Sequence, residues 1–433
     1  MIPFLIPIKS PESSELENTG RGGLLRAMQT TTPSALSDKT IAVVKSTAPV
    51  LEQHGELLTR HFYARMFREN PEVKALFNSS NQGGTQQKAL AGAICAFAAN
   101  VDRLEALASA VERIAQKHAG LGIQPEHYPV VGANLLASIR EVLGEAATDD
   151  IIDAWAEAYG FLANILIGRE GAIYRDQAEA EHGWAGFKPF TIARKQVESE
   201  VITSFYLKPV DDSKVPSYKP GQYLTVRVPD AVSGTTMRNY SLSSAHSPEG
   251  FRISVKAEPS GSVSGFLHAQ EEGTVLEIGP PCGEFFLDLN GDPTRPLVLI
   301  SGGVGITPTL AMLETALKAW PEREIVFIHG ALNGRTHAFR DALLDLSIDH
   351  PLLTLHTRYS SPTEEDRERG GFDSEGYVDG DLIASLVPRF DGDYYFCGPK
   401  PFMIGIYRQL AEWGVAAERI HFEFFGPRQE LEA

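Results

Sequence analysis

The sequence predicts three successive domains: an all-α domain over residues 37–180, a small antiparallel β-barrel over 184–292, and an α/β domain with a parallel sheet over 295–433. Three observations lead to this multidomain fold class. Apolar residues in the first part recur at spacings of three and four, as on amphipathic helices. Short strand-like runs separated by turns follow, which is typical of a barrel. After Pro296, buried strand-like runs alternate with helix-like segments, which indicates a parallel sheet.

The composition limits the function classes that fit this chain. Its 433 residues are too many for a single hydrophobic core. The formal net charge of −17 disfavours contact with nucleic acid or with an anionic membrane. No apolar run approaches the length of a membrane span. The three cysteines are far apart, so we expect a reducing compartment and no disulfide framework.

Residues 1–36 precede the first helical pattern and are rich in small and polar residues, which predicts a disordered extension. Arg21 and Arg26 would suit a mitochondrial transit peptide, but three glutamates between residues 12 and 17 would not. We therefore expect a cytoplasmic protein, with a mitochondrial location as the alternative. A monomer is expected.

Within each domain, particular segments carry the pattern. The helix-like segments of the first domain are 51–68, 104–117 and 151–167. The strand-like runs of the second are Val201–Leu207, Tyr223–Val228, Phe251–Val255 and Val275–Ile278. In the third, a helix is expected over Pro308–Ala319, and the strands are Leu297–Ile300, Ile325–His329 and Tyr394–Cys397.

A glycine-rich turn, Gly302–Pro308, joins a buried strand to a helix in the third domain. The free N–H groups and positive dipole end of such a helix suit a pyrophosphate, and Pro308 fits its first turn. Alone the turn is weak evidence, because similar turns occur for steric reasons and the full G-x-G-x-x-G spacing is missing. Its position between a barrel and Cys397-Gly398-Pro399 favours a nicotinamide dinucleotide site.

A second motif, Arg238–Ser241, follows Gly221-Gln222-Tyr223 in the predicted barrel. Arg238 can hold a phosphate through two parallel hydrogen bonds, and Tyr240 offers a flat face and a hydroxyl to a flavin. Alone, the motif would read as an ordinary strand with a surface arginine. Together with the two downstream motifs, it indicates a flavin site.

In the helical domain, His118 continues a helical stripe that includes Leu107, Val111 and Ile114. A lone histidine on an apolar face is usually a core residue. Glu170, however, also lies on an apolar stripe, and a buried carboxylate needs a partner. A histidine that binds haem iron commonly donates its other N–H to a carboxylate. Tyr128 could join such a network.

With these residues in view, the chain from about Ser37 to Pro427 resembles the flavohaemoglobins, which join a globin to a ferredoxin-reductase-like module and act as nitric oxide dioxygenases. The globin part of the resemblance is carried by residues 58–67, 77–82, 114–118 and 158–164. The reductase part is carried by the three motifs, by residues 372–376 and by residues 421–427.

The resemblance implies haem b, FAD and NADH or NADPH as cofactors, and a role for each matching residue. On the haem side, it implies His118 as the iron ligand, Tyr128 and Glu170 behind it, Lys117 beside it, Phe77 against the haem, and Tyr63, Gln86 and Leu90 on the distal side. For FAD, it implies Tyr223, Arg238, Asn239, Tyr240 and Ser241 as binding residues, Glu423 at the flavin edge, and Phe424, Phe425, Gly426 and Pro427 over the ring. For the nicotinamide cofactor, it implies Gly303, Val304, Gly305, Ile306, Thr307, Pro308, Cys397, Gly398 and Pro399.

Two departures from the family pattern concern Phe424, where cysteine is common, and the loop before Gln86, which is one residue short. The implied reaction passes electrons from NAD(P)H through FAD to the haem iron, where dioxygen converts nitric oxide to nitrate. A haem-based oxygen or redox sensor and a general NAD(P)H-dependent reductase stay open as alternatives. Tyr128 with Glu170 favours the dioxygenase, because a sensing globin does not need a strengthened iron ligand. The choice between NADH and NADPH also stays open.

Overall fold

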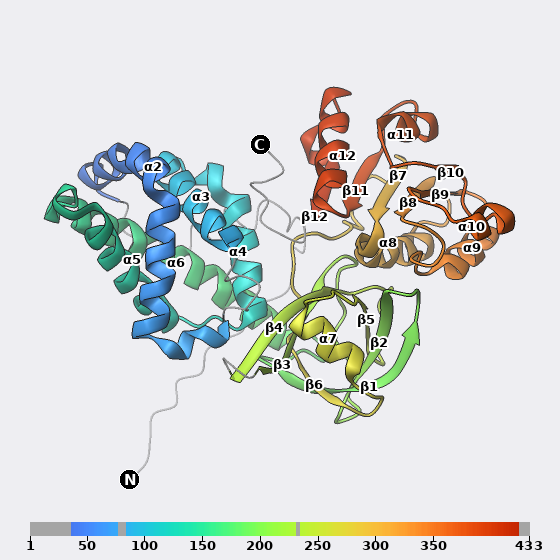
Figure 1. Ribbon diagram of the computed structural model, residues 1–433, viewed down its shortest axis with the longest axis horizontal. Coiled ribbons are helices and arrows are strands. Elements are labelled where there is room, and N and C mark those ends of the chain that lie inside the picture. Colours follow the sequence, from blue (N-terminus) through green and yellow to red (C-terminus); the bar gives the residue numbers. More distant parts are fainter. Residues whose placement is uncertain (1–35, 77–83, 231–233, 424–433) are drawn as a thin grey trace, which may run out of the picture.

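The computed structural model describes residues 36–76, 84–230 and 234–423, without the side chains of residues 84–86, 89 and 104. Its three parts follow one another along the chain (Figure 1): a helical domain, a β-barrel below and to one side of it, and a parallel-sheet domain above the barrel. The fold class expected from the sequence is therefore confirmed. Residues 1–35 of the expected N-terminal extension lie outside the described residues.

The first domain is built from helices that pack around one apolar core. Its elements are α2 (Asp38–Glu69), η1 (Pro71–Leu76), α3 (Gly84–Asn100), η3 (Leu104–Leu107), α4 (Ala108–Leu121), α5 (His127–Leu143), η4 (Gly144–Ala146) and α6 (Asp149–Glu179).

Helix α2 begins earlier than the expected segment 51–68 and continues through Pro49. Ser37 caps its first turn, since the Ser37 side chain accepts a hydrogen bond from the Thr40 backbone N–H at 3.1 Å. Val44, Leu51 and Leu58 repeat every seven residues and are all buried, so one apolar stripe runs past the proline. Burial of that stripe offsets the hydrogen bond that Pro49 cannot make.

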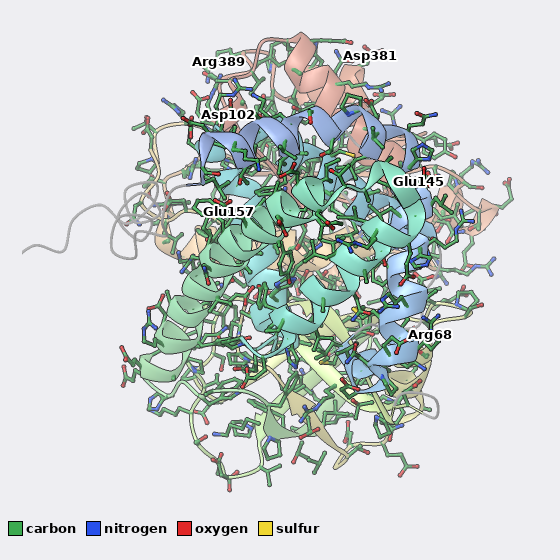
Figure 2. The ribbon with its side chains drawn as sticks, turned by 90° about the vertical axis from the view of Figure 1, so that its left-hand side faces the viewer. Arg68, Asp102, Glu145, Glu157, Asp381 and Arg389 are labelled. Carbon is green, nitrogen blue, oxygen red and sulfur yellow. The ribbon has the colours of Figure 1, made fainter. Side chains whose placement is uncertain are left out.

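Helix α6 is also long and apolar enough, by length and composition alone, to cross a membrane. The core helices of globular domains pass the same test. Here α6 packs against α2, α4 and α5. The outer face of this domain carries exposed charged side chains such as Asp102, Glu145 and Glu157 (Figure 2).

The second domain is a six-stranded antiparallel sheet in the order β4-β3-β6-β1-β2-β5. A bridge between Leu242 and Ile253 brings the β4 and β5 edges together, which closes the sheet into a barrel around an apolar core. Its elements are β1 (Lys188–Val197), β2 (Ile202–Pro209), β3 (Tyr223–Asp230), β4 (Gly234–Ser241), β5 (Phe251–Lys256), α7 (Ser262–Ala269) and β6 (Val275–Ile278).

The third domain is a parallel sheet in the order β10-β9-β8-β7-β11-β12, covered by helices. The residues of its central strand β7 are buried on both faces, as in α/β folds. Its strands are β7 (Leu297–Gly302), β8 (Ile325–Ala331), β9 (Leu353–Tyr359), β10 (Ser374–Glu375), β11 (Asp393–Cys397) and β12 (Ile420–Glu423). Its helices are η5 (Gly303–Gly305), α8 (Ile306–Ala319), α9 (Arg340–Asp349), α10 (Glu364–Arg369), α11 (Gly380–Leu386), α12 (Lys400–Glu412) and η6 (Ala417–Arg419).

Candidate functional site

Three side chains from three helices meet in the helical domain: His118 of α4, Tyr128 of α5 and Glu170 of α6. The His118 Nδ1 atom lies 2.7 Å from Glu170 Oε1, and the Tyr128 hydroxyl donates to the same oxygen at 2.5 Å. Glu170 is 2% exposed, so its oxygens need these hydrogen-bond donors. Because a carboxylate only accepts hydrogen bonds, His118 Nδ1 must carry the proton, which leaves Nε2 with a free lone pair.

This trio fits a haem iron ligand. Burial and the hydrogen bond to Glu170 raise the pKa of the Tyr128 phenol, so Tyr128 stays a neutral donor. The side chain of His118 is 33% exposed, and its helix neighbours Ala115 and Ala119 belong to an apolar cluster that also contains Tyr128, Ala163 and Leu166. A partly exposed imidazole whose Nδ1 atom is hydrogen-bonded to a buried carboxylate is an arrangement typical of a histidine that binds haem iron.

Two further phenols hold the backbone that carries Tyr128. The Tyr159 hydroxyl donates to the Tyr128 carbonyl at 2.6 Å, and the Tyr174 hydroxyl donates to the Ile123 carbonyl at 2.5 Å. Both tyrosines belong to α6, the helix of Glu170. One helix therefore orients the carboxylate and the segment that donates to it. The sequence alone did not identify Tyr159 and Tyr174 as part of this site.

The residues expected on the distal side lie on other helices. Tyr63 is on α2 and packs edge-on against Phe62, with 5.1 Å between ring centroids. Burial raises the pKa of the Tyr63 phenol, which therefore stays protonated and able to donate. Leu90 is on α3 beside the helical core. Gln86 begins the same helix, but its side chain lies outside the described residues, as does Phe77.

In the barrel, two residues of adjacent strands carry buried hydroxyls that have no hydrogen-bond partner in the described part of the chain. Tyr223 and Ser241 are register partners on β3 and β4, and neither the Tyr223 hydroxyl nor Ser241 Oγ has a hydrogen bond among the described residues. Buried hydroxyls without a partner cost free energy. A polar ligand such as the ribityl or phosphate part of a flavin would satisfy both.

The motif Arg238–Ser241 spreads over both faces of β4. Side chains alternate along a strand, so Asn239 and Ser241 share the face of Tyr223, while Arg238 and Tyr240 take the other. Asn239 Oδ1 accepts from Thr225 Oγ1 at 2.9 Å. Burial lowers the pKa of Arg238, whose one hydrogen bond in the described chain goes to the Met237 carbonyl at 3.5 Å. A half-buried guanidinium without a carboxylate fits a phosphate.

In the third domain, the two expected nicotinamide motifs pack against each other. Strands β7 and β11 are neighbours, with Ser301 opposite Cys397, so the turn Gly303–Pro308 and the turn Cys397–Pro399 leave the same edge of the sheet. A side chain at Gly305 would collide with the Cys397 carbonyl and the Gly398 N–H, so this contact requires glycine. The carboxyl edge of a parallel sheet is where such folds bind nucleotides.

Glu423 lies beside Cys397 at the same edge, as its register partner on β12. Its Oε2 atom is fully shielded and has no hydrogen bond among the described residues, although the residue as a whole is partly exposed. Burial and the charge of Glu284 raise the pKa of Glu423 to about 8, against an opposing effect of Lys117. Glu423 of the third domain and Lys117 of the first are therefore electrostatic neighbours, with Glu284 beside them. Phe424 to Pro427 lie outside the described residues.

Helix α4 also rests directly on the barrel. Gln116 Oε1 accepts from the Gly283 backbone N–H at 3.1 Å. A Cβ atom at Gly120 would lie 2.9 Å from Thr225 Oγ1, so the helix backbone and β3 are in close contact. Gln177 of α6 donates to Cys282 Sγ at 3.0 Å. These contacts join residues more than 100 positions apart, so no local pattern along the chain predicts them.

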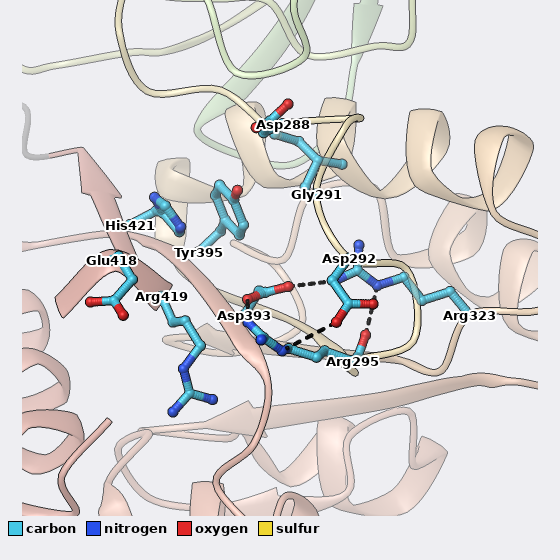
Figure 3. A pocket seen from close by; sticks show the side chains of 11 residues that line it. Asp288, Gly291, Asp292, Arg295, Arg323, Asp393, Tyr395, Glu418, Arg419 and His421 are labelled. Atoms are coloured by element: carbon cyan, nitrogen blue, oxygen red, sulfur yellow. Dashed lines mark hydrogen bonds and ion pairs between the residues drawn. The ribbon is translucent and has the colours of Figure 1, made fainter. Parts of the chain in front are cut away.

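A separate pocket lies at the opposite, amino-terminal edge of the sheet, where β11 begins at Asp393 (Figure 3). Arg323 Nη2 lies 2.7 Å from Asp393 Oδ2, and Arg295 Nε lies 3.5 Å from Asp292 Oδ2. These charges pair with one another. These ion pairs link the segment between barrel and sheet to the start of β11, at the edge opposite the proposed nucleotide site.

Comparisons with protein families agree with this division. The globin family matches residues 60–166, the oxidoreductase FAD-binding domain matches 189–287, and the oxidoreductase NAD-binding domain matches 299–408. The fold and the site geometry thus define a globin joined to a flavin- and nicotinamide-dependent oxidoreductase module.

The chain belongs to the flavohemoprotein family. A flavohemoprotein of Rhodopirellula baltica is 50% identical over 407 residues, covering 92% of this chain and 100% of the relative. One of Bordetella pertussis is 49% identical over 398 residues, covering 90% and 98%. The crystal structure of a flavohemoglobin from Malassezia yamatoensis with bound FAD and heme is similar, with a TM-score of 0.80 and 30% identity, covering 91% of this chain and 100% of that one. An FAD/NAD-binding domain of nitric oxide dioxygenase from Vibrio cholerae aligns with a TM-score of 0.50 and 35% identity, covering 55% and 99%.

Proposed function

We propose that this protein is an NAD(P)H-dependent nitric oxide dioxygenase that uses haem, FAD and a nicotinamide cofactor. The observation that carries the proposal is the pairing of His118 with Glu170 and Tyr128 on a helix that also contacts the flavin domain. The relationship to flavohemoproteins along the whole length of those proteins supports it, as does the similarity to a nitric oxide dioxygenase domain.

The haem-side residues have separable tasks. Glu170 accepts the Nδ1 proton of His118, which makes Nε2 a stronger donor to iron. Tyr128 adds a second hydrogen bond to the buried Glu170 carboxylate and so fixes its orientation. Tyr63, whose phenol burial keeps protonated, would donate a hydrogen bond on the distal side of a bound haem.

When bound, the nicotinamide, flavin and haem groups would supply the hydride and electron chemistry for oxidation of nitric oxide by dioxygen to nitrate. Arg238 would neutralise a phosphate of FAD, and Tyr223 and Ser241 would donate hydrogen bonds to it from one face of the barrel strands. The turn Gly303–Pro308 offers backbone N–H groups to the nicotinamide cofactor's phosphates. Burial raises the pKa of the Cys397 thiol well above its ordinary value, so Cys397 lines the site as a neutral group.

Several properties of the proposed enzyme rest on sequence arguments alone. A cytoplasmic location follows from the absence of a disulfide framework, with mitochondria as the alternative. A monomeric state, and nitric oxide as the second substrate beside dioxygen, belong to the same proposal. The net charge of −17 supports the expectation that nucleic acid is not a partner.

Nitric oxide consumption tests the function. Purified protein with NADH or NADPH under oxygen should remove nitric oxide and form nitrate, and its spectrum should combine a haem Soret band with flavin absorbance. His118→Ala should lose haem and nitric oxide consumption but keep FAD, because the flavin site lies in another domain. Haem-loaded protein that oxidises NAD(P)H without consuming nitric oxide would instead support a sensor or a general reductase.

A further inference from the structure

Glu314 of helix α8 holds two groups of the barrel with one carboxylate. Its Oε1 atom lies 2.9 Å from Nη2 of Arg252 on β5, and its Oε2 atom accepts from the Ala245 backbone N–H at 2.7 Å. Both side chains are largely shielded, at 14% exposed for Arg252 and 23% for Glu314. Charge-assisted hydrogen bonds of this kind are shorter and stronger than neutral ones.

Arg252 is itself fixed on the barrel side. Its guanidinium donates to the Ser243 carbonyl and, through Nε, to Ser243 Oγ at 3.2 Å. Ser243 and Ala245 directly follow the strand β4, which ends at Ser241 of the flavin motif. The barrel end of this contact is therefore continuous with the proposed flavin site.

On the other side, α8 starts directly after the turn Gly303–Gly305 that is proposed to bind the nicotinamide cofactor's phosphates. Glu314 is eight residues beyond Ile306, about 12 Å along the helix at 1.5 Å per residue. Figure 1 shows α8 on the side of the sheet nearest to the barrel. One carboxylate thus connects the phosphate-binding helix to the segment that follows the flavin motif.

Apolar contacts surround this connection. A Cβ atom at Gly221 would lie 2.5 Å from the Met312 methyl, so α8 packs tightly on the turn before Tyr223. Ile202 of β2 belongs to the same core cluster as Leu310 and Leu313 of α8. These contacts hold the two domains together but are not directional. The charged contact of Glu314 is directional and sets the angle of α8 against the barrel.

We propose that Glu314 is a positioning residue for hydride transfer: through Arg252 and Ala245, it fixes the orientation of the nicotinamide-binding helix relative to the flavin. The inference rests on the proposed binding of FAD and a nicotinamide cofactor, but on no step of nitric oxide chemistry. A misplacement of about 1 Å can cost about 100-fold in rate, so a directional contact at this interface should control the hydride-transfer rate.

The test compares Glu314→Ala and Glu314→Gln with Lys318→Gln, an exposed residue of the same helix. Flavin reduction by NADH is followed in anaerobic stopped flow over a range of NADH concentrations. The limiting rate should fall by about tenfold or more in Glu314→Ala, while the half-saturating NADH concentration changes less than about twofold. Glu314→Gln keeps one acceptor for Ala245 and should lie between Ala and the parent. Lys318→Gln should match the parent.

Two more readouts separate positioning from folding. Hydrogen exchange of the Ala245 amide in protein without NADH should accelerate in Glu314→Ala and not in Lys318→Gln. Arg252→Lys, which keeps the charge opposite Glu314, should retain more of the limiting rate than Arg252→Ala. FAD and haem contents should equal those of the parent in every variant.

Parent-like limiting rates in Glu314→Ala with FAD retained would overturn the inference. Rate loss accompanied by loss of FAD would also overturn it, because Glu314 would then act on flavin binding. If the parent itself binds no FAD or does not oxidise NADH, the proposed function fails instead, which is a distinguishable result.

Discussion

Replacing Tyr128 with phenylalanine tests the haem-side network most sharply. The change removes one hydroxyl and keeps the ring. That hydroxyl donates at 2.5 Å to Glu170, a carboxylate that is 2% exposed and whose other donor is His118 Nδ1 at 2.7 Å. Of the two donors to this buried carboxyl group among the described residues, the variant therefore leaves one.

A second tyrosine in the same domain serves as a reference for the expected loss of folding free energy. Tyr159 also donates through its hydroxyl, at 2.6 Å, but to the neutral carbonyl of Tyr128. A hydrogen bond to a charged group contributes roughly 1.5–3 kcal/mol, and one to a neutral group roughly 0.5–1.5 kcal/mol. Tyr128→Phe should therefore destabilise the helical domain by about 1 kcal/mol more than Tyr159→Phe does.

The assay is guanidinium unfolding of haem-loaded protein followed at the Soret band, combined with the rate of haem loss to an excess of apomyoglobin. Tyr128→Phe should unfold at lower denaturant and lose haem faster than Tyr159→Phe. In a double-mutant cycle with Glu170→Gln, the two changes should be coupled, because they remove the same interaction. Equal costs for the two tyrosines, or additive effects of Tyr128→Phe and Glu170→Gln, would refute the reasoning.

Three further predictions follow from other parts of the molecule. Arg238→Ala should weaken FAD binding by roughly 2–5 kcal/mol, because it strips one partner from a desolvated charge pair; equilibrium dialysis of FAD would measure this, and haem content should not change. The pKa of Glu423 rises from 4.5 to about 8 on folding, so the stability contributed by its protonated form is complete below pH 4.5 and is lost as pH rises through 8. Glu423→Gln should not show this loss of stability, which is at most about 5 kcal/mol at 1.36 kcal/mol per pKa unit. The measurement is thermal unfolding at a series of pH values, in which the unfolding temperatures of variant and parent should converge at low pH. Tyr63→Phe should speed dioxygen dissociation by at least about tenfold, because the lost hydrogen bond to a charged acceptor contributes roughly 1.5–3 kcal/mol, while dye reduction by NAD(P)H stays normal. An unchanged off-rate in flash photolysis would remove Tyr63 from the distal site.

Sequence periodicity was sufficient to predict that His118 and Glu170 interact. Each lies on an apolar helical stripe, where a polar side chain needs a partner. Local turn chemistry was sufficient for the nicotinamide edge, where β7 ends in glycines and α8 begins with Pro308 nearby. Both signals are local along the chain. The structure adds that Cys397 and Glu423 are register partners, so that two distant motifs share one edge of the sheet.

Contacts between domains could not be found in this way. Gln116 with Gly283 and Glu314 with Arg252 join residues that no periodic pattern relates, and each alone would read as an ordinary surface side chain. The strand position of the flavin motif shows a similar limit. The motif was expected in the barrel, but no strand was expected over residues 234–241, and the pairing of Ser241 with Tyr223 depends on the register between two strands. That register is set by the packing of the whole barrel.

The close contact between α4 and the barrel has a consequence for protein engineering. A side chain at Gly120 would crowd Thr225, and the Gln116 side chain accepts a hydrogen bond from the Gly283 backbone N–H. A globin from another source that is fused to this reductase would therefore need a glycine at the position of Gly120 and a glutamine at the position of Gln116. It would also need the equivalent of Gln177, which donates to Cys282, in order to pack correctly on the barrel. Isolated, the helical domain would expose a surface shaped for its neighbour. The globin surface is thus specific for this barrel, and an exchange of the globin domain requires transfer of its contact residues Gln116, Gly120 and Gln177 as well.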